Sequence, residues 1–187
     1  MTVFYLVRHA HALWPPPQGT HAENRPLSQK GLQGAQRIAA VLRGYPITTI
    51  YASPARRAQQ TVEPLAADLD LPVRVAPELA ERVLCARVVQ DFDGAVRATW
   101  DDLNFAHPGG ETNAAAQRRG VGFVKRLIAR RPKGHVVLGT HGVLLAIVLR
   151  HYDPSIGYAF WRALTMPDVY RMEVHVDGVI SIDRLLE

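Results

Sequence analysis

The chain has 187 residues, of which 48% are hydrophobic and 21% charged, and its formal net charge is +5. This length and composition are typical of one soluble globular domain. The longest apolar run, residues 143–149, is too short to span a bilayer, so we expect no membrane association. A lone cysteine, Cys85, excludes an internal disulfide and favours a reducing compartment, so we predict a cytoplasmic protein.

The positive charge comes from arginines scattered along the chain, in short pairs such as Arg56-Arg57 and Arg118-Arg119. Proteins that bind nucleic acid usually concentrate basic residues in a tail or patch, and this sequence has no such tail and no aromatic-rich RNA motif. We therefore expect no nucleic-acid partner, since the charge suits a small anionic substrate equally well. The oligomeric state stays open, with a homodimer among the alternatives.

Strand and helix patterns alternate in the first half of the chain. Apolar runs predict strands at residues 3–7, 47–51 and 71–75. Between the first two, Ser28 suits a helix N-cap and Gly44 a helix end. The apolar residues of that helix share one face and should be buried: Leu32, Ala35, Ile38, Ala39 and Leu42.

A second helix is predicted to begin at Ser53-Pro54, with serine as its N-cap and proline as its first residue. It should run toward Leu69, and Pro64 should kink it or end it early. Periodicity is then weak from about 78 to 108, so we expect an excursion that covers a functional site.

The last part of the chain returns to regular patterns. A helix at about 112–130 should bury Val121, Val124, Leu127 and Ile128. A buried strand at 135–140 is followed at once by a helix from about 143, and Asp177-Gly178 predicts a hairpin turn between 170–176 and 179–182. The whole alternation predicts an α/β fold with a mostly parallel sheet.

Charged and imidazole side chains follow the predicted strands. Arg8 and His9 follow the first strand, His141 follows the strand at 135–140, and Arg57 lies in the first turn of a helix that follows another strand. Ligands of open parallel sheets bind at the carboxyl ends of the strands, and helix N-termini attract anions. The planar guanidinium of arginine pairs with two phosphate oxygens at once. The four side chains should therefore converge on an anion pocket.

Five segments resemble the histidine phosphatase superfamily, which includes the cofactor-dependent phosphoglycerate mutases. Residues 7–10, "VRHA", resemble its Arg-His-Gly signature, and "SPARRAQQT" resembles a Ser-Pro-Leu-x-Arg-Ala-x-x-Thr segment that places the second phosphate arginine at Arg57. "RPLSQKGLQGAQRIAAVL", "HPGGET" and "VVLGTHGVLLAIVL" are similar to three more segments, in the family's order. The resemblance is to the broad-specificity phosphatase branch. It implies a phosphoglycerate mutase-like single domain over residues 1–187, with three α/β/α layers.

The sequence departs from the family at two places. Ala10 stands where the family has glycine, which fits if the backbone there does not need a positive φ. After Glu81 the chain reads "RVLCARVVQDFDG" in place of the family's Phe-Gly-x-x-Glu-Gly, in the region that would select the substrate.

The resemblance implies a role for each strand-end residue. His9 would attack phosphorus and form a phosphohistidine, while its other ring nitrogen donates a proton to a backbone carbonyl and so fixes the tautomer. Arg8, Arg57 and His141 would hold the phosphoryl oxygens. Because these fixed cations take the place of a metal ion, we expect neither a metal nor another cofactor. The expected function is hydrolysis of a small phosphorylated metabolite.

Three carboxylates are candidates for supporting roles. The family alignment favours Glu81 as the acid that protonates the leaving group and later activates water, with Glu78 as its competitor. Glu111 resembles a family glutamate near the phosphate arginines, although an acid also suits a helix start. Nearby, His11 should lie in a loop at the pocket mouth, and Trp14 is either a pocket wall or a buried anchor.

Other functions compete with phosphomonoester hydrolysis. A short-type phosphohistidine phosphatase is one, since such proteins resemble the "RPLSQKG" region. A phosphoglycerate mutase and a non-catalytic phosphate-binding module are others. His9 and His11 together could also serve a metal-dependent hydrolase, although no cluster of acids completes a ligand set.

Overall fold

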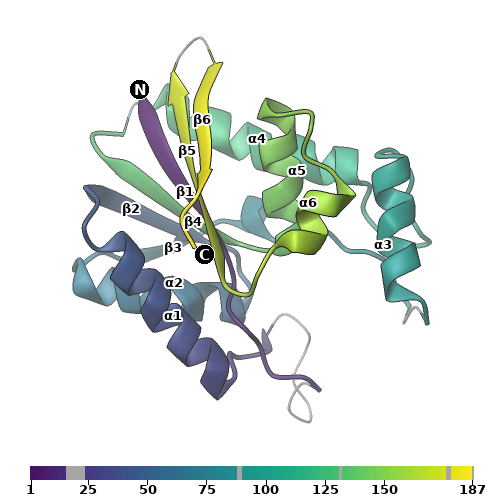
Figure 1. The fold of residues 1–187 in the computed structure, drawn as a ribbon, viewed down its shortest axis with the longest axis horizontal. Helices are drawn as coiled ribbons and strands as arrows, with labels where there is room; N and C mark the ends of the chain where they lie inside the picture. Colours follow the sequence, from purple (N-terminus) through teal and green to yellow (C-terminus); the bar gives the residue numbers. More distant parts are fainter. Residues whose placement is uncertain (16–23, 88–89, 131, 176–177, 187) are drawn as a thin grey trace.

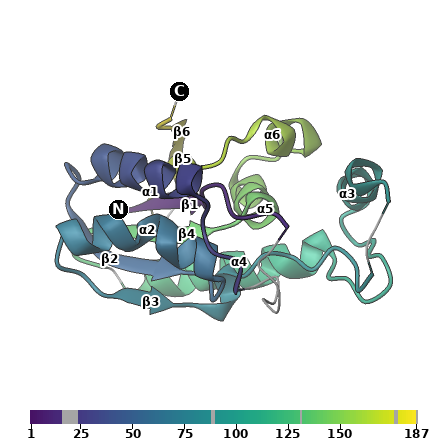
Figure 2. The ribbon, with the colours of Figure 1, turned by 90° about the horizontal axis from the view of Figure 1, so that it is seen from below.

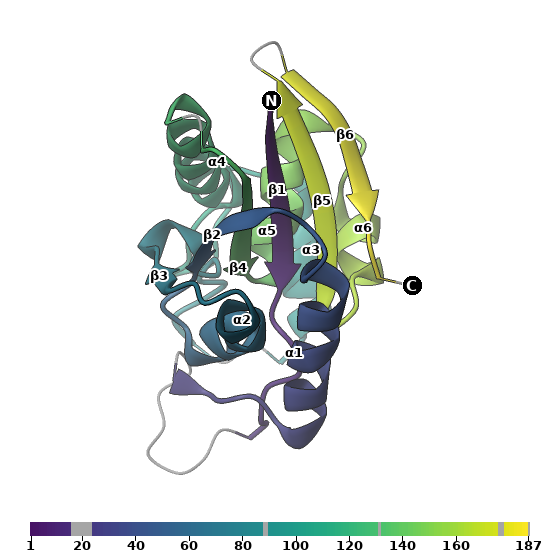
Figure 3. The ribbon, with the colours of Figure 1, turned by 90° about the vertical axis from the view of Figure 1, so that its left-hand side faces the viewer.

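The computed structural model describes residues 1–15, 24–87, 90–130, 132–175 and 178–186. Across these residues, six strands form one sheet in the order β3-β2-β4-β1-β5-β6 (Figure 1). The strands are β1 (Thr2–Arg8), β2 (Ile47–Ala52), β3 (Val73–Val75), β4 (His135–Thr140), β5 (Asp168–His175) and β6 (Gly178–Arg184). The first four are parallel to one another, and β5 runs antiparallel to both β1 and β6 at one side of the sheet (Figure 3). The predicted α/β fold with a mostly parallel sheet is confirmed.

Helices cover both faces of this sheet (Figure 1). They are α1 (Gln29–Leu42), α2 (Arg56–Asp68), α3 (Phe92–Asp101), α4 (Asn113–Ala129), α5 (Gly142–Tyr152) and α6 (Tyr158–Ala163), with a short 3₁₀ helix, η2 (Pro77–Leu79). Successive residues of a strand point to opposite faces. Phe4 and Leu6 of β1 accordingly pack in a core with α4 and α5, whereas Tyr5 and Val7 pack in a second core with α1 and α2. Two cores on one sheet make the three layers.

Helix α1 follows its predicted pattern with one exception. The Ser28 hydroxyl caps it by accepting from the Gly31 N–H, and four of the five predicted core residues are buried. Leu32, the fifth, is 43% exposed, so that prediction is wrong. The buried edge of the helix passes through Gly31 instead, where a Cβ would lie 2.0 Å from the carbonyl oxygen of His11.

Helix α2 begins later than predicted and runs toward Leu69 as expected. Its N-cap is Ala55 and not Ser53, so the predicted serine cap is wrong. Pro64 lies inside the helix, which continues to Asp68 in spite of it. Leu65 and Ala66, directly after the proline, are buried against the sheet, and this packing outweighs the missing backbone hydrogen bond. Strand β3 is also shorter than the predicted 71–75.

The weakly periodic stretch from 78 to 108 contains regular structure that the sequence pattern did not indicate. Helix α3 lies within it, at the end of the molecule beyond α5 (Figure 2), and buries Val96 and Trp100. Helix α6 was not predicted either. The predicted hairpin forms between β5 and β6, but Asp177 of its turn lies outside the described residues. In the described part of the chain, no helix has the length and apolar character needed to cross a membrane.

Candidate active site

The carboxyl ends of three parallel strands meet at one edge of the sheet. The registers place the last residues of β1 and β2 beside the end of β4. Two backbone hydrogen bonds extend these registers past the strand ends, from the His9 N–H to the Thr140 carbonyl (2.9 Å) and from the Ser53 N–H to the Gly139 carbonyl (2.8 Å). His9, Ser53 and His141 are neighbours for this reason.

His9 is a buried, neutral imidazole with a defined tautomer. Its Nδ1 lies 2.8 Å from the carbonyl oxygen of Ala10, which can only accept, so Nδ1 carries the proton and Nε2 a free lone pair. Burial lowers the pKa of His9 to about 3, and the charges of Arg57 and Arg8 act in the same direction. The ring is therefore unprotonated at neutral pH. The expected bond to a backbone carbonyl is present, and its acceptor is Ala10.

Ala10 fits its position without strain. Asp70 is the one non-glycine residue with positive φ among the described residues, so the backbone at Ala10 does not call for glycine. The Ala10 N–H donates to the Thr61 hydroxyl (2.9 Å), which itself donates to the Arg57 carbonyl (2.7 Å). Thr61 thus ties the end of β1 to the first turn of α2. It is the last residue of the "SPARRAQQT" segment, which is the sequence signal for it.

His141 lies between an arginine and a serine. An Arg57 guanidinium N–H donates to Nδ1 of His141 (3.2 Å), so the imidazole proton is on Nε2 and is donated to the Ser53 hydroxyl (2.8 Å). Burial lowers the pKa of His141 well below its usual value, and His9 and Arg57 add to the effect. The rings of His9 and His141 meet edge to face with centroids 5.2 Å apart. Ser53, predicted only as a helix cap, is therefore part of the site.

Arg8 is held at its guanidinium group from two sides. Its Nη1 donates to the carbonyl oxygens of Leu164 (2.8 Å) and Thr165 (3.3 Å). On the other side it lies against the start of α5, where a Cβ on Gly142 would be 3.0 Å from its Nε. That Nε is buried and has no hydrogen-bond partner among the described residues. The Nε of Arg8 is therefore a buried donor that the described residues leave unpaired.

Glu81 and Glu78, the two candidates for the acid, point to different places. The Glu81 carboxylate accepts three backbone N–H bonds, from Arg82 (2.9 Å), Val143 (3.1 Å) and Leu144 (3.0 Å). It therefore occupies the N-terminus of α5, directly after His141. The Glu78 carboxylate instead forms an ion pair with Arg126 on the outside of α4. Of the two, only Glu81 lines the cavity described next.

A cavity of about 340 Å³ opens at this edge of the sheet. Its lining includes Trp14, Arg25, Ser53, Arg57, Glu81 and His141. His9 is not part of the lining, but its ring contacts that of His141, which is. Three predicted members of the site, Arg57, Glu81 and His141, thus face an open volume. His9 lies next to it, and Arg8 is not part of the lining.

Two arginines in the cavity wall were not singled out from the sequence. Arg82 is 5% exposed, and its Nε and Nη1 are buried without a hydrogen-bond partner in the described residues. Burial lowers its pKa. Arg25 stacks over the ring of Trp14 with its guanidinium carbon 5.2 Å from the ring centroid. No local pattern marks either arginine, because each gains its position only when distant segments meet.

Glu111 pairs with Arg119, an arginine other than the two predicted to bind phosphate. Its carboxylate forms a bidentate pair with Arg119, with both N–O distances 2.8 Å. Arg119 also donates to the Glu78 carbonyl (2.8 Å), and the Glu111 N–H donates to the Val83 carbonyl (2.8 Å). Glu111 and Arg119 therefore brace the segment that carries Glu81.

The remaining candidates divide between the cavity and the surface. Trp14 is 76% exposed and lines the cavity, so it is a pocket wall and not a buried anchor. His11 is exposed, with Nδ1 2.8 Å from the Ser28 hydroxyl. In the described part of the chain, no three His, Cys, Asp or Glu side chains lie together as metal ligands would.

The fold and this arrangement together define a class, the α/β phosphatases with a phosphoglycerate mutase-like sheet. Two neutral histidines and several arginines surround a cavity at the carboxyl edge of the parallel strands. Such a site can bind a phosphoryl group and offers an imidazole nitrogen as nucleophile.

Comparison with known proteins narrows this class to one family. The family model described as "Histidine phosphatase superfamily (branch 1)" matches residues 4–178, so the chain belongs to this superfamily. The predicted resemblance is confirmed, and the protein is a phosphatase.

The similar proteins are named as phosphatases or as a hydrolase. The adenosylcobalamin/alpha-ribazole phosphatase of Escherichia coli (strain K12) is 28% identical over 145 residues, which cover 73% of this chain and 71% of that protein. The structure of a mycobacterial glucosyl-3-phosphoglycerate phosphatase with VO3 matches with a TM-score of 0.79 and 25% identity, covering 100% of this chain and 99% of that one. The structure named Mycobacterial hydrolase 1 has the same TM-score and identity and covers 97% and 96%.

Proposed function

We propose that the protein hydrolyses small phosphomonoesters through a phosphohistidine at His9, without a metal or other cofactor. One observation carries this proposal: the Nδ1–H of His9 donates to the Ala10 carbonyl, which leaves Nε2 as a nucleophile beside the Arg57–His141 pair. A neutral imidazole in this position needs no separate base to activate it.

The reaction consists of two displacements at phosphorus. Nε2 of His9 attacks, and the bond from phosphorus to the leaving alkoxide breaks, while Arg8 and Arg57 hold the other oxygens and His141 keeps Arg57 in place. Water then attacks the phosphohistidine and loses a proton to a base. The P–N bond breaks, and the products are inorganic phosphate and the original imidazole.

Glu81 is the proposed acid and base. Its three N–H partners hold the carboxyl group in place at the cavity. The protonated carboxyl group gives its proton to the leaving alkoxide, and the resulting carboxylate later accepts a proton from water. Its place in the cavity lining supports Glu81 over Glu78.

The same carboxylate distinguishes the proposed function from a short-type phosphohistidine phosphatase. The imidazole released from a phosphohistidine is a better leaving group than an alkoxide, so its release has less need of a carboxylic acid in the cavity. The exposed His11 gives the metal-dependent alternative no support, because its Nδ1 contacts the Ser28 hydroxyl. A cytoplasmic location remains part of the proposal, in keeping with the lone cysteine.

The cavity also suggests a class of substrate. Arg25 and Arg82 add positive charge beyond what one phosphoryl group needs, so we expect substrates with a second anionic group. Residues 80–83 belong to the lining, and we propose that this part of the 78–108 excursion selects the substrate.

The test is to trap the phosphoenzyme. The protein is mixed with a ³²P-labelled phosphomonoester in EDTA and quenched into alkaline detergent, in which a phosphohistidine survives. We expect label on the wild type and none on His9→Asn, with full turnover of the wild type in EDTA. Label that persists on His9→Asn, or turnover that EDTA abolishes, would falsify the proposal.

Arg57 and its neighbour Arg56 allow a matched test of which arginine binds phosphate. Arg57 contacts His141, whereas Arg56 forms an exposed ion pair with Glu63. We expect Arg57→Ala to lower kcat/KM by about 100-fold or more and Arg56→Ala to change it by less than about twofold. The reverse order would show that the phosphate arginine is assigned to the wrong position.

A further inference from the structure

The phosphate arginine Arg8 has a buried acid as its cross-strand partner. Arg8 and Asp168 are directly paired between the antiparallel strands β1 and β5. Asp168 is 0% exposed and its charge acts on Arg8: burial lowers the pKa of Arg8, and the carboxylates of Glu81 and Asp168 oppose this effect. The two side chains nevertheless form no ion pair within the described residues.

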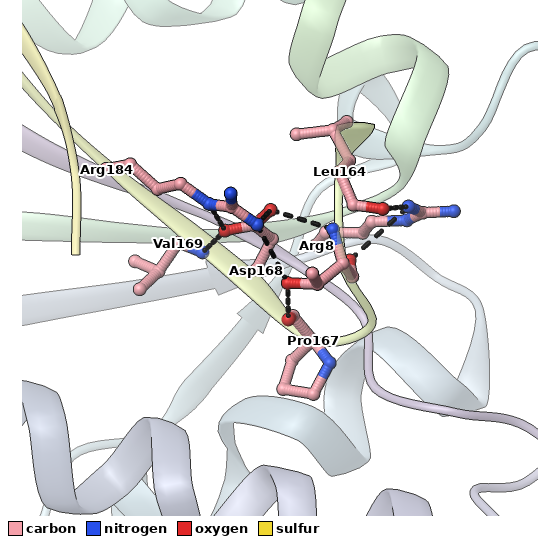
Figure 4. Close-up of polar contacts among 7 residues, drawn as sticks. Arg8, Leu164, Pro167, Asp168, Val169 and Arg184 are labelled. Carbon is pink, nitrogen blue, oxygen red and sulfur yellow. Dashed lines mark hydrogen bonds and ion pairs between the residues drawn. The ribbon is translucent and has the colours of Figure 1, made fainter. Parts of the chain in front are cut away.

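Asp168 forms its ion pair with Arg184 instead (Figure 4). This arginine comes from the last residue of β6 and pairs with both carboxylate oxygens, through Nε at 3.0 Å and Nη2 at 2.8 Å. The N–H groups of Thr165 (2.9 Å) and Val169 (3.0 Å) donate to the same carboxylate. Asp168 therefore has four donors and no need of a fifth.

Arg8 is aimed away from this acid by neutral groups. Its Nη1 donates to the Leu164 and Thr165 carbonyls, and Figure 4 shows the Leu164 carbonyl beside the guanidinium. Carbonyl oxygens hold a guanidinium in place but leave its net charge uncompensated. That charge is what a phosphoryl group at the cavity would bind.

We propose that Arg184 is a positioning residue, which neutralises Asp168 and so keeps this acid from capturing Arg8. The inference rests on the proposed role of Arg8 in binding phosphate. Opposite charges attract strongly in a buried environment. Without Arg184, the charge of Asp168, which already acts on Arg8 across the two strands, would attract its guanidinium. A pairing of that kind would turn Arg8 away from the substrate.

If the Arg184–Asp168 ion pair had a purely structural role, the variants would behave differently. If Arg184 and Asp168 only join β6 to β5, losing either residue is harmful, and losing both is no better than losing one. If Arg184 masks the charge of Asp168, losing Arg184 alone is harmful and removing the acid as well restores binding. The sign of the coupling between the two positions decides between these readings.

The experiment compares Arg184→Gln, Asp168→Asn and the double variant with the wild type. For each, the Kd for inorganic phosphate is measured by calorimetry, and KM and kcat are measured with one phosphomonoester. We expect Arg184→Gln to raise the phosphate Kd and KM by about tenfold with a smaller change in kcat. Asp168→Asn and the double variant should stay within about threefold of the wild type, because neither contains the competing acid.

Arg171→Gln serves as the control for stability. Arg171 lies on the same hairpin, is 25% exposed against 35% for Arg184, and pairs with Glu173 and Asp183, away from the 164–168 loop. It should change the phosphate Kd by less than about twofold. If Arg184→Gln does not fold, Arg184→Met and the double variant provide the same comparison.

Three results would overturn the inference. They are an unchanged phosphate Kd in Arg184→Gln, a double variant that binds no better than Arg184→Gln, and an Asp168→Asn variant as impaired as Arg184→Gln. Failure of the proposed function is seen separately, as a wild type that yields no phosphoenzyme. The phosphate Kd values are measured without turnover and test the positioning of Arg8 in either case.

Discussion

Gly142 lies close to the guanidinium of Arg8 in the site. Gly142 is the first residue of α5 and has an ordinary helical φ, so the backbone there does not require glycine. The missing side chain instead leaves room for the guanidinium of Arg8. A Cβ there would lie 3.0 Å from Nε and 3.1 Å from Cζ of Arg8. These distances are tighter than normal van der Waals contacts, so the flexible end of Arg8 would move.

We therefore expect Gly142→Ala to lower activity without lowering stability. A shift of the guanidinium by a few tenths of an ångström should reduce kcat/KM by about tenfold. Alanine is the better helix former, so the free energy of unfolding should stay the same or rise by up to about 1 kcal/mol. Steady-state kinetics and urea unfolding measure the two quantities.

Gly122→Ala in α4 is the matched control for this prediction. A Cβ at Gly122 would meet only the Arg126 Nη1, at an ordinary 3.7 Å. It should give the same gain in helix propensity with unchanged kinetics. Equal activity in the two variants would show that Arg8 tolerates the added methyl group.

At the scale of elements, the start of α5 combines two functions. The helix begins directly after His141, and the Glu81 carboxylate binds the N–H groups of Val143 and Leu144 in its first turn. A negative charge at this position stabilises a helix through its unpaired N–H groups and its dipole. The proposed acid is thus held beside the cavity by the element that follows the second histidine.

Glu81→Gln should separate these two functions. It keeps one carbonyl acceptor but loses the charge, so the free energy of unfolding should fall by about 1 kcal/mol. Without a proton donor, kcat for an alkyl phosphate should fall by about 100-fold, and kcat for p-nitrophenyl phosphate far less, because p-nitrophenolate barely needs protonation. Kinetics with both substrates and denaturant unfolding provide the readouts.

Glu78→Gln is the comparison for both readouts. Its ion pair with Arg126 lies at the surface of α4, and exposed pairs contribute little to stability. Activity on either substrate should therefore change by less than about twofold. If Glu81→Gln slows both substrates equally, the acid role belongs to another residue.

Because α2 starts later than predicted, the Ser53 side chain is part of the site and not a helix cap. Because Ala55 is the N-cap, the Ser53 hydroxyl lies before the helix and accepts the proton of His141 Nε2. A serine committed to capping the N2 or N3 N–H would be less available to the imidazole. The sequence "SPAR" therefore predicts a helix start, but in the fold its serine accepts a hydrogen bond from His141.

At the scale of the whole molecule, folding buries two histidines in neutral form. The pKa of His9 is lowered to about 3 and that of His141 is lowered well below its usual value, in both cases chiefly by burial. In the unfolded chain both rings should titrate near 6.5. Between these values the unfolded state binds protons that the folded state does not, so stability is lost as the pH falls.

We expect the free energy of unfolding to decrease from pH 7 to pH 5, with His9 alone contributing about 2 kcal/mol. Urea unfolding at a series of pH values measures the slope. His9→Asn should reduce that slope by the contribution of one bound proton, since the variant has no imidazole at this position to protonate. A slope that is the same with and without His9 would contradict the neutral, buried state of this ring.

The architecture was largely predictable from the sequence because it depends on local patterns. Strands β1, β2 and β4 are short apolar runs, and α1 and α4 show helical spacing with good N-caps, so their place in the α/β order could be assigned. Helices α3 and α6 were missed because they are short and their few apolar residues lie in irregular stretches. The error at Leu32 arose because Gly31, which has no side chain to signal burial, lies on the buried edge.

The sequence by itself determined the family, the strand-end position of Arg8, His9 and His141, and the register that selects Arg57 over Arg56. Motifs and periodicity are properties of neighbouring residues, so one chain suffices to see them. The tertiary structure alone decided that Glu81 and not Glu78 faces the cavity, that Arg82 lines it, and that Arg184 and not Arg8 pairs with Asp168. Each of these depends on which distant side chains share a buried space, and burial and hydrogen-bond partners are set only when the layers pack together.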